Sequence, residues 1–309
     1  MSELISIIMS TYNEKEEWLH KSIESILHQT YVNLEFIIVL DNPENLALKE
    51  LLFDYVEMDP RVTVIINEEN LGLVRSLNRA LQHCTGVYIA RMDADDISHE
   101  NRLQLQKDYL EKEQLDFVFS SVTMIDEEGD EMSQTCRRDL TPHQVKKKLG
   151  MVNMSFHPTW LVKKQVYDQL GGYRDIAHCE DYDFSLRAIG SGYRIGKLNE
   201  SLLFCRFRET SVSRSYSLEQ FLTSRRLIDL YQKGRLDQAL VFNSHALQRV
   251  TEKDKEKFKQ AEVTYTNGIR SLKNDQKVKG MGLIAASSFK SKYYLLKNLY
   301  YLYYKSKDL

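Results

Sequence analysis

Hydrophobic and polar positions alternate in blocks along the N-terminal part of the chain. Short apolar runs occupy 4–9, 34–40, 62–66 and 86–92, and each is followed by a polar turn. Between these runs, at 18–27, 46–58 and 71–83, apolar residues recur at helical spacing. Near-continuous apolar strands that alternate with amphipathic helices indicate a parallel sheet covered by helices on both faces. The pattern therefore predicts an α/β fold.

The later part of the chain changes character. Further strands are expected at 115–122, 160–162, 193–198 and 202–207, with a short helix at 141–149. A polar stretch at 211–214 predicts a flexible loop, and from Leu218 onward the spacing of apolar residues is helical. We therefore expect one α/β domain over residues 1–212 and a helical C-terminal extension over residues 213–309.

Polar residues gather just beyond the predicted parallel strands. They are Thr11, Tyr12, Asn13 and Glu14 after the first strand, Asp41 after the second, Asn70 and Arg75 after the third, and Asp93 with Asp95 after the fourth. Open α/β sheets bind ligands at the carboxyl ends of their strands. The pattern predicts a ligand-binding cleft at this edge of the sheet.

The segment Asp93-Ala94-Asp95-Asp96 is the most acidic of these turns. Carboxylates two positions apart on an extended segment point the same way, which suits a hard divalent ion that shares its coordination with phosphates. The alternative is a polar turn in which Asp96 caps the next helix, since Ser98 and Glu100 resemble a helix start. The segment by itself leaves both interpretations open.

Composition excludes several classes of protein. The 309 residues are 42% hydrophobic and 28% charged, and the net charge of −2 gives no sign of a nucleic-acid partner. Four scattered cysteines favour reduced thiols over disulfides or a zinc site. There is no secretory signal pattern, no apolar run of the ~20 residues that span a bilayer, and no glycine-rich dinucleotide or P-loop pattern. We expect a cytoplasmic protein, at most peripheral to a membrane.

An ordered set of segments resembles the glycosyltransferase family 2. The segments are Ser10-Thr11-Tyr12-Asn13-Glu14, the strand that ends at Asp41, Asn70-Leu71-Gly72, Met92-Asp93-Ala94-Asp95-Asp96, His157-Pro158-Thr159, Gly171-Gly172-Tyr173 and Glu180-Asp181. The resemblance spans roughly residues 4 to 210 and is most similar to the amylovoran and capsular-polysaccharide transferase branch. It implies a GT-A fold, a mostly parallel Rossmann-like sheet flanked by helices.

The resemblance also implies a nucleotide-sugar site. Thr11, Tyr12 and Asp41 would hold the uracil and ribose of a UDP-sugar, with Tyr12 offering a stacking face. The other residues that the resemblance places on the donor are Asn13, Glu14, Asn70, Arg75, Asp93 and Ala94. Many family members carry two aspartates after the second strand, whereas here Leu40 stands at the first of these positions and leaves Asp41 alone.

The implied chemistry needs a metal ion and a base. Asp95 and Asp93, with His157 as a further candidate ligand, would bind Mn²⁺ or Mg²⁺ at the diphosphate, and the ion would act as a Lewis acid. Asp181 would deprotonate the acceptor hydroxyl, supported by Glu180, and the two roles are exchangeable. Without the resemblance, acidic residues at a helix start need no further explanation than the helix dipole.

The C-terminal stretch 289–305 mixes tyrosines, leucines and lysines. Three interpretations stay open: contact with a membrane interface, a helix packed on its neighbours, and a protein-binding helical repeat.

These observations lead to one main hypothesis, an inverting, metal-dependent transferase that moves a sugar from a UDP-sugar to a hydroxyl of a lipid-linked glycan in capsular or exopolysaccharide synthesis. The alternatives are a glycoprotein acceptor, a non-enzymatic nucleotide-sugar-binding scaffold and, least favoured, a nucleotidyltransferase. A homodimer is left open.

Overall fold

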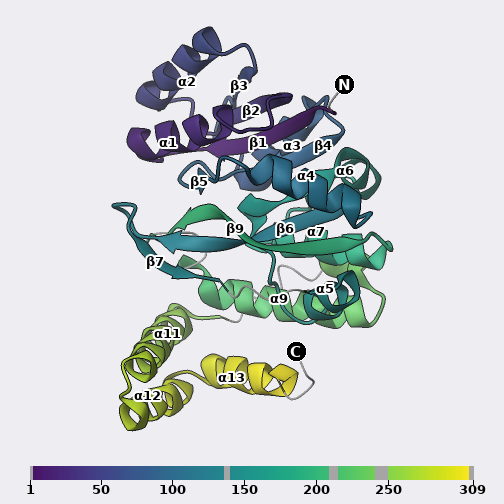
Figure 1. Cartoon of the computed structure of the whole chain (residues 1–309). Coiled ribbons are helices and arrows are strands. Elements are labelled where there is room, and N and C mark those ends of the chain that lie inside the picture. Colours follow the sequence, from purple (N-terminus) through teal and green to yellow (C-terminus); the bar gives the residue numbers. More distant parts are fainter. Residues whose placement is uncertain (1–2, 136–139, 209–214, 241–249, 306–309) are drawn as a thin grey trace. The chain divides into compact units, whose positions relative to one another are not determined.

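The computed structural model describes residues 3–135, 140–208, 215–240 and 250–305 (Figure 1). The chain divides into two compact units, one formed by residues 1–175 and 180–208, the other by residues 176–179 and 209–309. The predicted domain boundary at 212/213 and the predicted loop at 211–214 lie outside the described residues.

The first unit begins with the parallel sheet that the sequence predicts. Its elements are β1 (Ile5–Thr11), α1 (Glu16–Leu27), β2 (Leu34–Leu40), α2 (Leu46–Met58), β3 (Val62–Ile66), α3 (Leu73–Gln82) and β4 (Tyr88–Arg91). Strand β1 pairs in parallel with β2 and with β4, and β2 pairs in parallel with β3. Side chains of β1 and β2 are almost all buried, which explains their continuous apolar sequence.

The second half of this unit is mixed. It contains β5 (Ile97–Ser98), α4 (Arg102–Lys112), β6 (Phe117–Ile125), β7 (Glu131–Gln134), α5 (Pro142–Leu149), η1 (His157–Thr159), β8 (Leu161–Lys163), α6 (Lys164–Leu170), α7 (Glu180–Gly190) and β9 (Ile195–Arg206). In the described residues the strands form one nine-stranded sheet of order β3-β2-β1-β4-β8-β6-β9-β5, with β7 on β6. Strand β8 is antiparallel to both β4 and β6. The predicted α/β fold is thus confirmed, with antiparallel strands added to its parallel half.

Two local predictions are wrong. The strands expected at 193–198 and 202–207 are one continuous strand, β9, which stays paired with β6 through two register shifts. The helix expected to start near Ser98 begins at Arg102, after the short strand β5. Asp96 therefore caps no helix, and its partners lie elsewhere.

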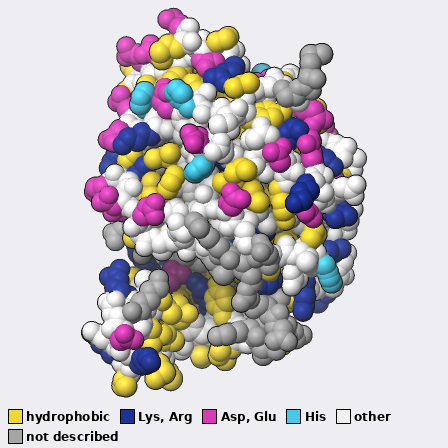
Figure 2. All heavy atoms as spheres, in the orientation of Figure 1, with side chains coloured by type: hydrophobic (Ala, Val, Ile, Leu, Met, Phe, Trp, Pro, Cys, Tyr) yellow, Lys and Arg dark blue, Asp and Glu magenta, His cyan; other side chains and the backbone are white. Residues whose placement is uncertain are grey.

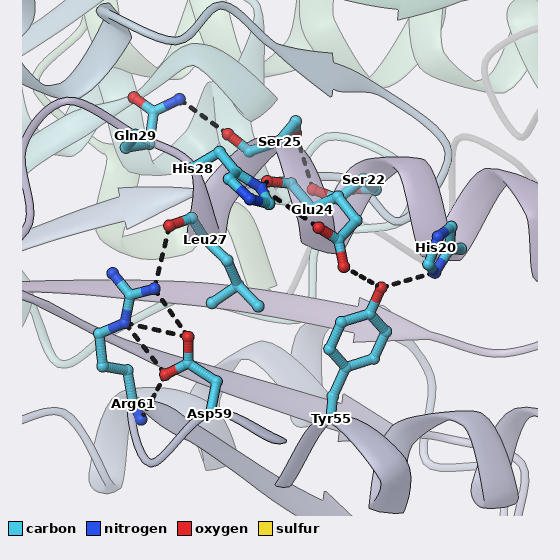
Figure 3. A network of polar contacts seen from close by, with 10 residues as sticks. All are labelled: His20, Ser22, Glu24, Ser25, Leu27, His28, Gln29, Tyr55, Asp59 and Arg61. Atoms are coloured by element: carbon cyan, nitrogen blue, oxygen red, sulfur yellow. Dashed lines mark hydrogen bonds and ion pairs between the residues drawn. The ribbon is translucent and has the colours of Figure 1, made fainter. Parts of the chain in front are cut away.

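A polar network joins α1 to α2 and to the turn before β3 (Figure 3). The Tyr55 hydroxyl donates to Glu24 Oε1 over 2.6 Å and lies 2.6 Å from His20 Nδ1. Arg61 pairs with Asp59 at 2.7 Å and donates to the carbonyl oxygen of Leu27, the last residue of α1, over 2.9 Å. These bonds hold the helices that follow β1 and β2, and hence the loops at the strand ends.

The second unit is helical, as the spacing from Leu218 predicts. It comprises α9 (Ser217–Gln232), η2 (Leu236–Gln238), α11 (Glu252–Lys273), α12 (Lys277–Lys290) and α13 (Lys292–Lys305). Thr251 and Asp254 form a capping box at the start of α11. Leu218, Phe258, Ala261 and Tyr294 form its buried apolar cluster. No described helix combines the length and the apolar character needed to cross a bilayer.

Candidate active site

Strand register brings the polar residues after β1, β2 and β3 to one edge of the sheet. Thr11 is paired with Leu40, and Leu40 with Ile66, so Asp41 and Asn67 follow at the same level. The order of strands reverses at β1, which lies between β2 and β4. Such a reversal opens a crevice at the carboxyl ends of the strands.

The loop after β1 is organised by one carboxylate. Glu14 Oε2 accepts hydrogen bonds from Thr11 Oγ1 and from the backbone amide of Tyr12, both over 2.7 Å. Asn13 Oδ1 accepts from Asn42 Nδ2 over 2.7 Å, which ties this loop to the one after β2. The Tyr12 side chain itself is exposed, so its ring is free to stack on a planar ligand.

Asp41 is buried and shapes the third loop. Its Oδ1 accepts from Asn67 Nδ2 over 2.6 Å and from the Leu71 amide over 2.8 Å, and its Oδ2 accepts from the Gly72 amide over 2.9 Å. Asn70 Oδ1 also accepts from the Gly72 amide, over 3.0 Å. The sequence-predicted residues Asp41 and Asn70 therefore lie together, and they meet at the backbone of the glycine before α3.

Arg75 lies in the first turn of α3 and is exposed. Its neighbour Ser76 is buried and accepts from Asn67 Nδ2 over 2.8 Å, so the two faces of this turn differ in character. Arg75 thus presents a charge at the surface of the third loop.

The acidic segment after β4 carries three carboxylates in a mostly buried turn. Asp93 forms an ion pair with Arg91, and Asp95 Oδ2 lies 2.7 Å from Arg208 Nη2. Burial, with the charge of Asp93 beside it, raises the pKa of Asp95 to about 6. Ala94 is buried between the two aspartates.

Asp96 points into the protein. Its Oδ1 accepts from the backbone amide of Arg206 over 2.8 Å, and the Arg206 guanidinium donates to the carbonyl of Asp95 over 2.9 Å. Among the described residues Asp96 Oδ2 has no hydrogen-bond partner, and burial raises the pKa of this carboxyl well above its usual range. Strand β9, through Arg206, thus holds the acidic turn in place.

This donor set fits a divalent cation. Burial and the charge of Asp93 both raise the pKa of Asp95, and a hard cation shared by these two carboxylates would relieve that crowding. The described residues contain no preformed group of three or more metal ligands. Asp93 and Asp95 are each held by an arginine, so a cation would compete with Arg91 and Arg208 for them.

A second acidic pair begins helix α7. Asp181 Oδ2 accepts from Asn153 Nδ2 over 3.0 Å, and its Oδ1 accepts from the Tyr182 amide over 2.6 Å. Burial, with the Asp181 charge second, raises the pKa of Glu180 to about 7. Burial also raises the pKa of Asp181. A carboxyl pair tuned in this way is suited to proton transfer near neutral pH.

Asp183 anchors this helix from inside the protein. It is fully buried, and its Oδ2 accepts from Arg174 Nε over 2.9 Å and from Arg187 Nε over 2.8 Å. Arg187 also donates hydrogen bonds to the carbonyl oxygens of Leu170 and Gly172. The network holds α7, and with it Glu180 and Asp181, against the turn that follows α6.

His157 lies in an aromatic cluster. Its Nε2 lies 2.8 Å from the Tyr173 hydroxyl, and its ring makes an edge contact with Trp160 at 4.6 Å between centroids. Burial lowers the pKa of His157 well below its usual value, so the imidazole is neutral. Gly172 precedes Tyr173 with φ +72°, and a side chain there would collide with Asn78.

Three further residues belong to the site and were not predicted. Arg91 is buried beside Asp93, and its charge also acts on Glu180 and Asp181. Asn153 and Arg208 reach the acidic groups from segments that no local pattern marks. For Arg91 the signal was available, since a basic residue stood directly beside the acidic turn in a buried strand.

Comparison with known proteins identifies the family. Residues 6–171 match the family model described as Glycosyl transferase family 2. The chain is 32% identical over 235 residues to the O-antigen biosynthesis glycosyltransferase WbnJ of Escherichia coli, an alignment that covers 72% of this chain and 91% of that protein. It is 30% identical over 254 residues to the amylovoran biosynthesis glycosyltransferase AmsE of Erwinia amylovora, covering 80% and 94%.

A third relative is described by its reaction. It is the UDP-Glc:alpha-D-GlcNAc-diphosphoundecaprenol beta-1,3-glucosyltransferase WfgD of Escherichia coli, 35% identical over 123 residues, with 40% of this chain and 47% of that protein covered.

Solved structures match the fold. Residues 1–349 of S. aureus TarS in complex with UDP-GlcNAc superpose with a TM-score of 0.59 at 16% identity, covering 93% of this chain and 90% of that one. The mannosyltransferase PcManGT of Pyrobaculum calidifontis, in complex with GDP-Man and Mn²⁺, gives 0.56 at 16% identity and covers 96% and 86%. At these identities the likeness concerns the fold alone.

Proposed function

Because the chain belongs to glycosyltransferase family 2 and has the GT-A fold, we propose that it transfers a sugar from a UDP-sugar to a hydroxyl of a glycan, with inversion at the anomeric carbon. The observation that carries the proposal is the pairing of two acidic groups in one unit. One is the Asp93–Asp96 turn at the end of β4, and the other is the Glu180–Asp181 pair at the start of α7.

The donor is proposed to bind at the ends of β1, β2 and β3. Tyr12 offers an exposed ring for the base, Thr11 is the last residue of β1, and Asp41 directly follows β2. The remaining proposed donor contacts are Asn13, Glu14, Asn70, Arg75, Asp93 and Ala94. The relative WfgD, which is described as using UDP-Glc, supports a uridine nucleotide as the donor.

Mn²⁺ or Mg²⁺ is proposed as the cofactor, held by Asp93 and Asp95. When bound, such an ion supplies Lewis-acid stabilisation to the departing diphosphate. We leave His157 out of this set, because its Nε2 is already engaged by Tyr173 and its ring is enclosed. The Mn²⁺ complex of PcManGT supports a divalent ion in this fold.

The acceptor step is assigned to the pair at the start of α7. The Asp181 carboxylate takes the proton of the acceptor hydroxyl as that oxygen attacks the anomeric carbon from the face opposite the nucleotide. The bond from the anomeric carbon to the diphosphate oxygen breaks in the same step, so the configuration inverts. Asn153 orients Asp181, and Glu180 holds the neighbouring position and supports the base.

The acceptor is proposed to be a lipid-linked repeat unit of a capsular polysaccharide or exopolysaccharide. The relatives WbnJ and AmsE are named for O-antigen and amylovoran biosynthesis, and WfgD for transfer to a diphosphoundecaprenol-linked sugar. The enzyme would then work as a peripheral protein at the cytoplasmic face of the membrane.

A panel of nucleotide sugars tests the proposal. The protein is incubated with each donor and Mn²⁺, and nucleotide release is measured with and without a lipid-linked glycan acceptor. We expect release from one UDP-sugar, strongly increased by acceptor, and a product of inverted anomeric configuration by NMR. Tight donor binding without any release would instead favour a nucleotide-sugar-binding scaffold.

A further inference from the structure

Charge is divided unequally between the two units. Residues 209–309 contain 19 Lys and Arg against 10 Asp and Glu, whereas residues 1–208 contain 23 against 34. The net charge of −2 thus hides a strongly basic C-terminal part and a strongly acidic N-terminal part. Residues 277–305, which form α12 and α13, hold six lysines and no acidic residue at all.

Helix α12 turns apolar side chains outward. Phe289 is 89% exposed, Val278 84% and Met281 61%, and they recur on one side of the helix together with Gly282 and Ala285. The opposite side is packed: a side chain at Gly280 would collide with Leu272 of α11. The outward residues therefore contribute nothing to the packing of α11 on α12.

Helix α13 repeats this arrangement. Leu295, Leu299 and Leu302 lie at helical spacing, and Leu299 and Leu302 are 55% and 64% exposed. The inward side holds Tyr294, which is buried against Phe258, and Lys297, which pairs with Glu262 of α11 at 2.7 Å. Figure 2 shows hydrophobic side chains gathered where Figure 1 draws the C-terminal helices.

Exposed aromatic and basic side chains accompany these apolar ones. Tyr301 and Tyr303 are about half exposed, and Lys277, Lys279 and Lys290 are exposed on α12. Large apolar groups, tyrosines and lysines on helices that contain no acidic residue are the composition of helices that lie in the plane of an anionic membrane interface.

We propose that the outward side of α12 and α13, defined by Val278, Met281, Phe289, Leu295, Leu299 and Leu302, is a membrane-contacting surface that binds anionic phospholipid bilayers. A second copy of the chain fits this surface less well, because it would bring two strongly basic units together. This surface would be where the proposed peripheral enzyme contacts the membrane. The inference rests on the proposed function only for the reason why the protein would bind a membrane.

Vesicle co-sedimentation of the full-length chain tests the surface. We expect binding to vesicles of phosphatidylglycerol mixed with phosphatidylcholine, little binding to phosphatidylcholine alone, and weaker binding as salt is raised. Leu299→Glu and Phe289→Glu should each weaken binding by about tenfold, because each places a charge where an apolar group would be buried. Val32→Glu, an equally apolar and exposed position (72%) in the first unit, should not change it.

Three outcomes would overturn the surface. They are no vesicle binding by the wild type, equal binding by Leu299→Glu, and a concentration-dependent dimer that Leu299→Glu abolishes while vesicle binding stays absent. Nucleotide release from UDP-sugars is measured in the same preparations. Nucleotide release without vesicle binding would reject the membrane-contacting surface and leave the proposed function standing. Vesicle binding without nucleotide release from any donor would reject the proposed function and leave the surface standing.

Discussion

Arg208 Nη2 lies 2.7 Å from Asp95 Oδ2, so a cationic side chain just beyond β9 holds the carboxylate that we assign to the metal. The same guanidinium lies over the ring of Trp18, with 5.7 Å to its centroid. A divalent ion bound at this oxygen would lie close to the Arg208 guanidinium, and their like charges would repel. Arg208 is therefore a competitor of the metal for Asp95.

Replacing Arg208 by Met should tighten Mn²⁺ binding by about fivefold, since a partly exposed ion pair of about 1 kcal/mol no longer opposes it. Isothermal titration calorimetry of Mn²⁺ against both proteins measures the change. Arg226→Met, which removes a surface pair with Asp229, is the matched control and should leave Mn²⁺ affinity unchanged. Weaker binding in Arg208→Met would contradict the competition.

Asp95→Asn should remove transfer while the fold stays intact. The substitution removes a proposed metal ligand, and we expect turnover to fall by more than about a hundredfold. The thermal unfolding temperature should not fall, because the carboxyl is buried among negative charges and its pKa is raised to about 6. Near-normal turnover of the variant in saturating Mn²⁺ would contradict the assignment of Asp95 as a metal ligand.

The sequence was most informative where structure is local. The buried runs of β1, β2 and β3 are continuous and apolar, so both the parallel strands and the polar positions after them could be predicted. The partners of those polar residues could not. Asp96 accepts a hydrogen bond from the backbone of Arg206, 110 positions later in the sequence. The local sequence suggested only that Asp96 would cap the next helix.

The same reason hid Arg208 and Asn153. Arg208 follows β9 and Asn153 precedes η1, and each contacts an acidic residue that is far away in the sequence. These contacts depend on how the second half of the sheet is paired. No local pattern marks that pairing, for example the antiparallel pairing of β8 with β4. The division of β9 into two predicted strands failed because polar residues interrupt a strand that β6 nevertheless keeps paired.

The pH profile of transfer should have an acidic limb at a pH above the usual range of carboxyl groups. Burial raises the pKa of both members of the Glu180–Asp181 pair, to about 7 for Glu180, and only the ionised base accepts a proton. Hence kcat/KM should rise with pH through a midpoint above the usual carboxyl pKa range and then level off. Glu180→Gln removes a neighbouring negative charge, so the midpoint should move to lower pH with activity retained.

Asp181→Asn separates the two roles. It should abolish transfer across the whole pH range and leave donor binding intact, as measured by calorimetry with a UDP-sugar. The reverse pattern, activity in Asp181→Asn and none in Glu180→Gln, would assign the base to Glu180.

Asp183→Asn should destabilise the first unit strongly. The carboxylate is fully buried between Arg174 and Arg187, and the substitution removes the negative charge that both guanidinium groups contact. Breaking a buried ion pair from one side costs about 3–5 kcal/mol, which urea denaturation measures as a lower midpoint at an unchanged slope. Asp168→Asn makes the same chemical change at an exposed pair with Lys164 and should cost less than about 0.5 kcal/mol. Equal midpoints for the two variants would mean that the Asp183 network does not hold α7 in place.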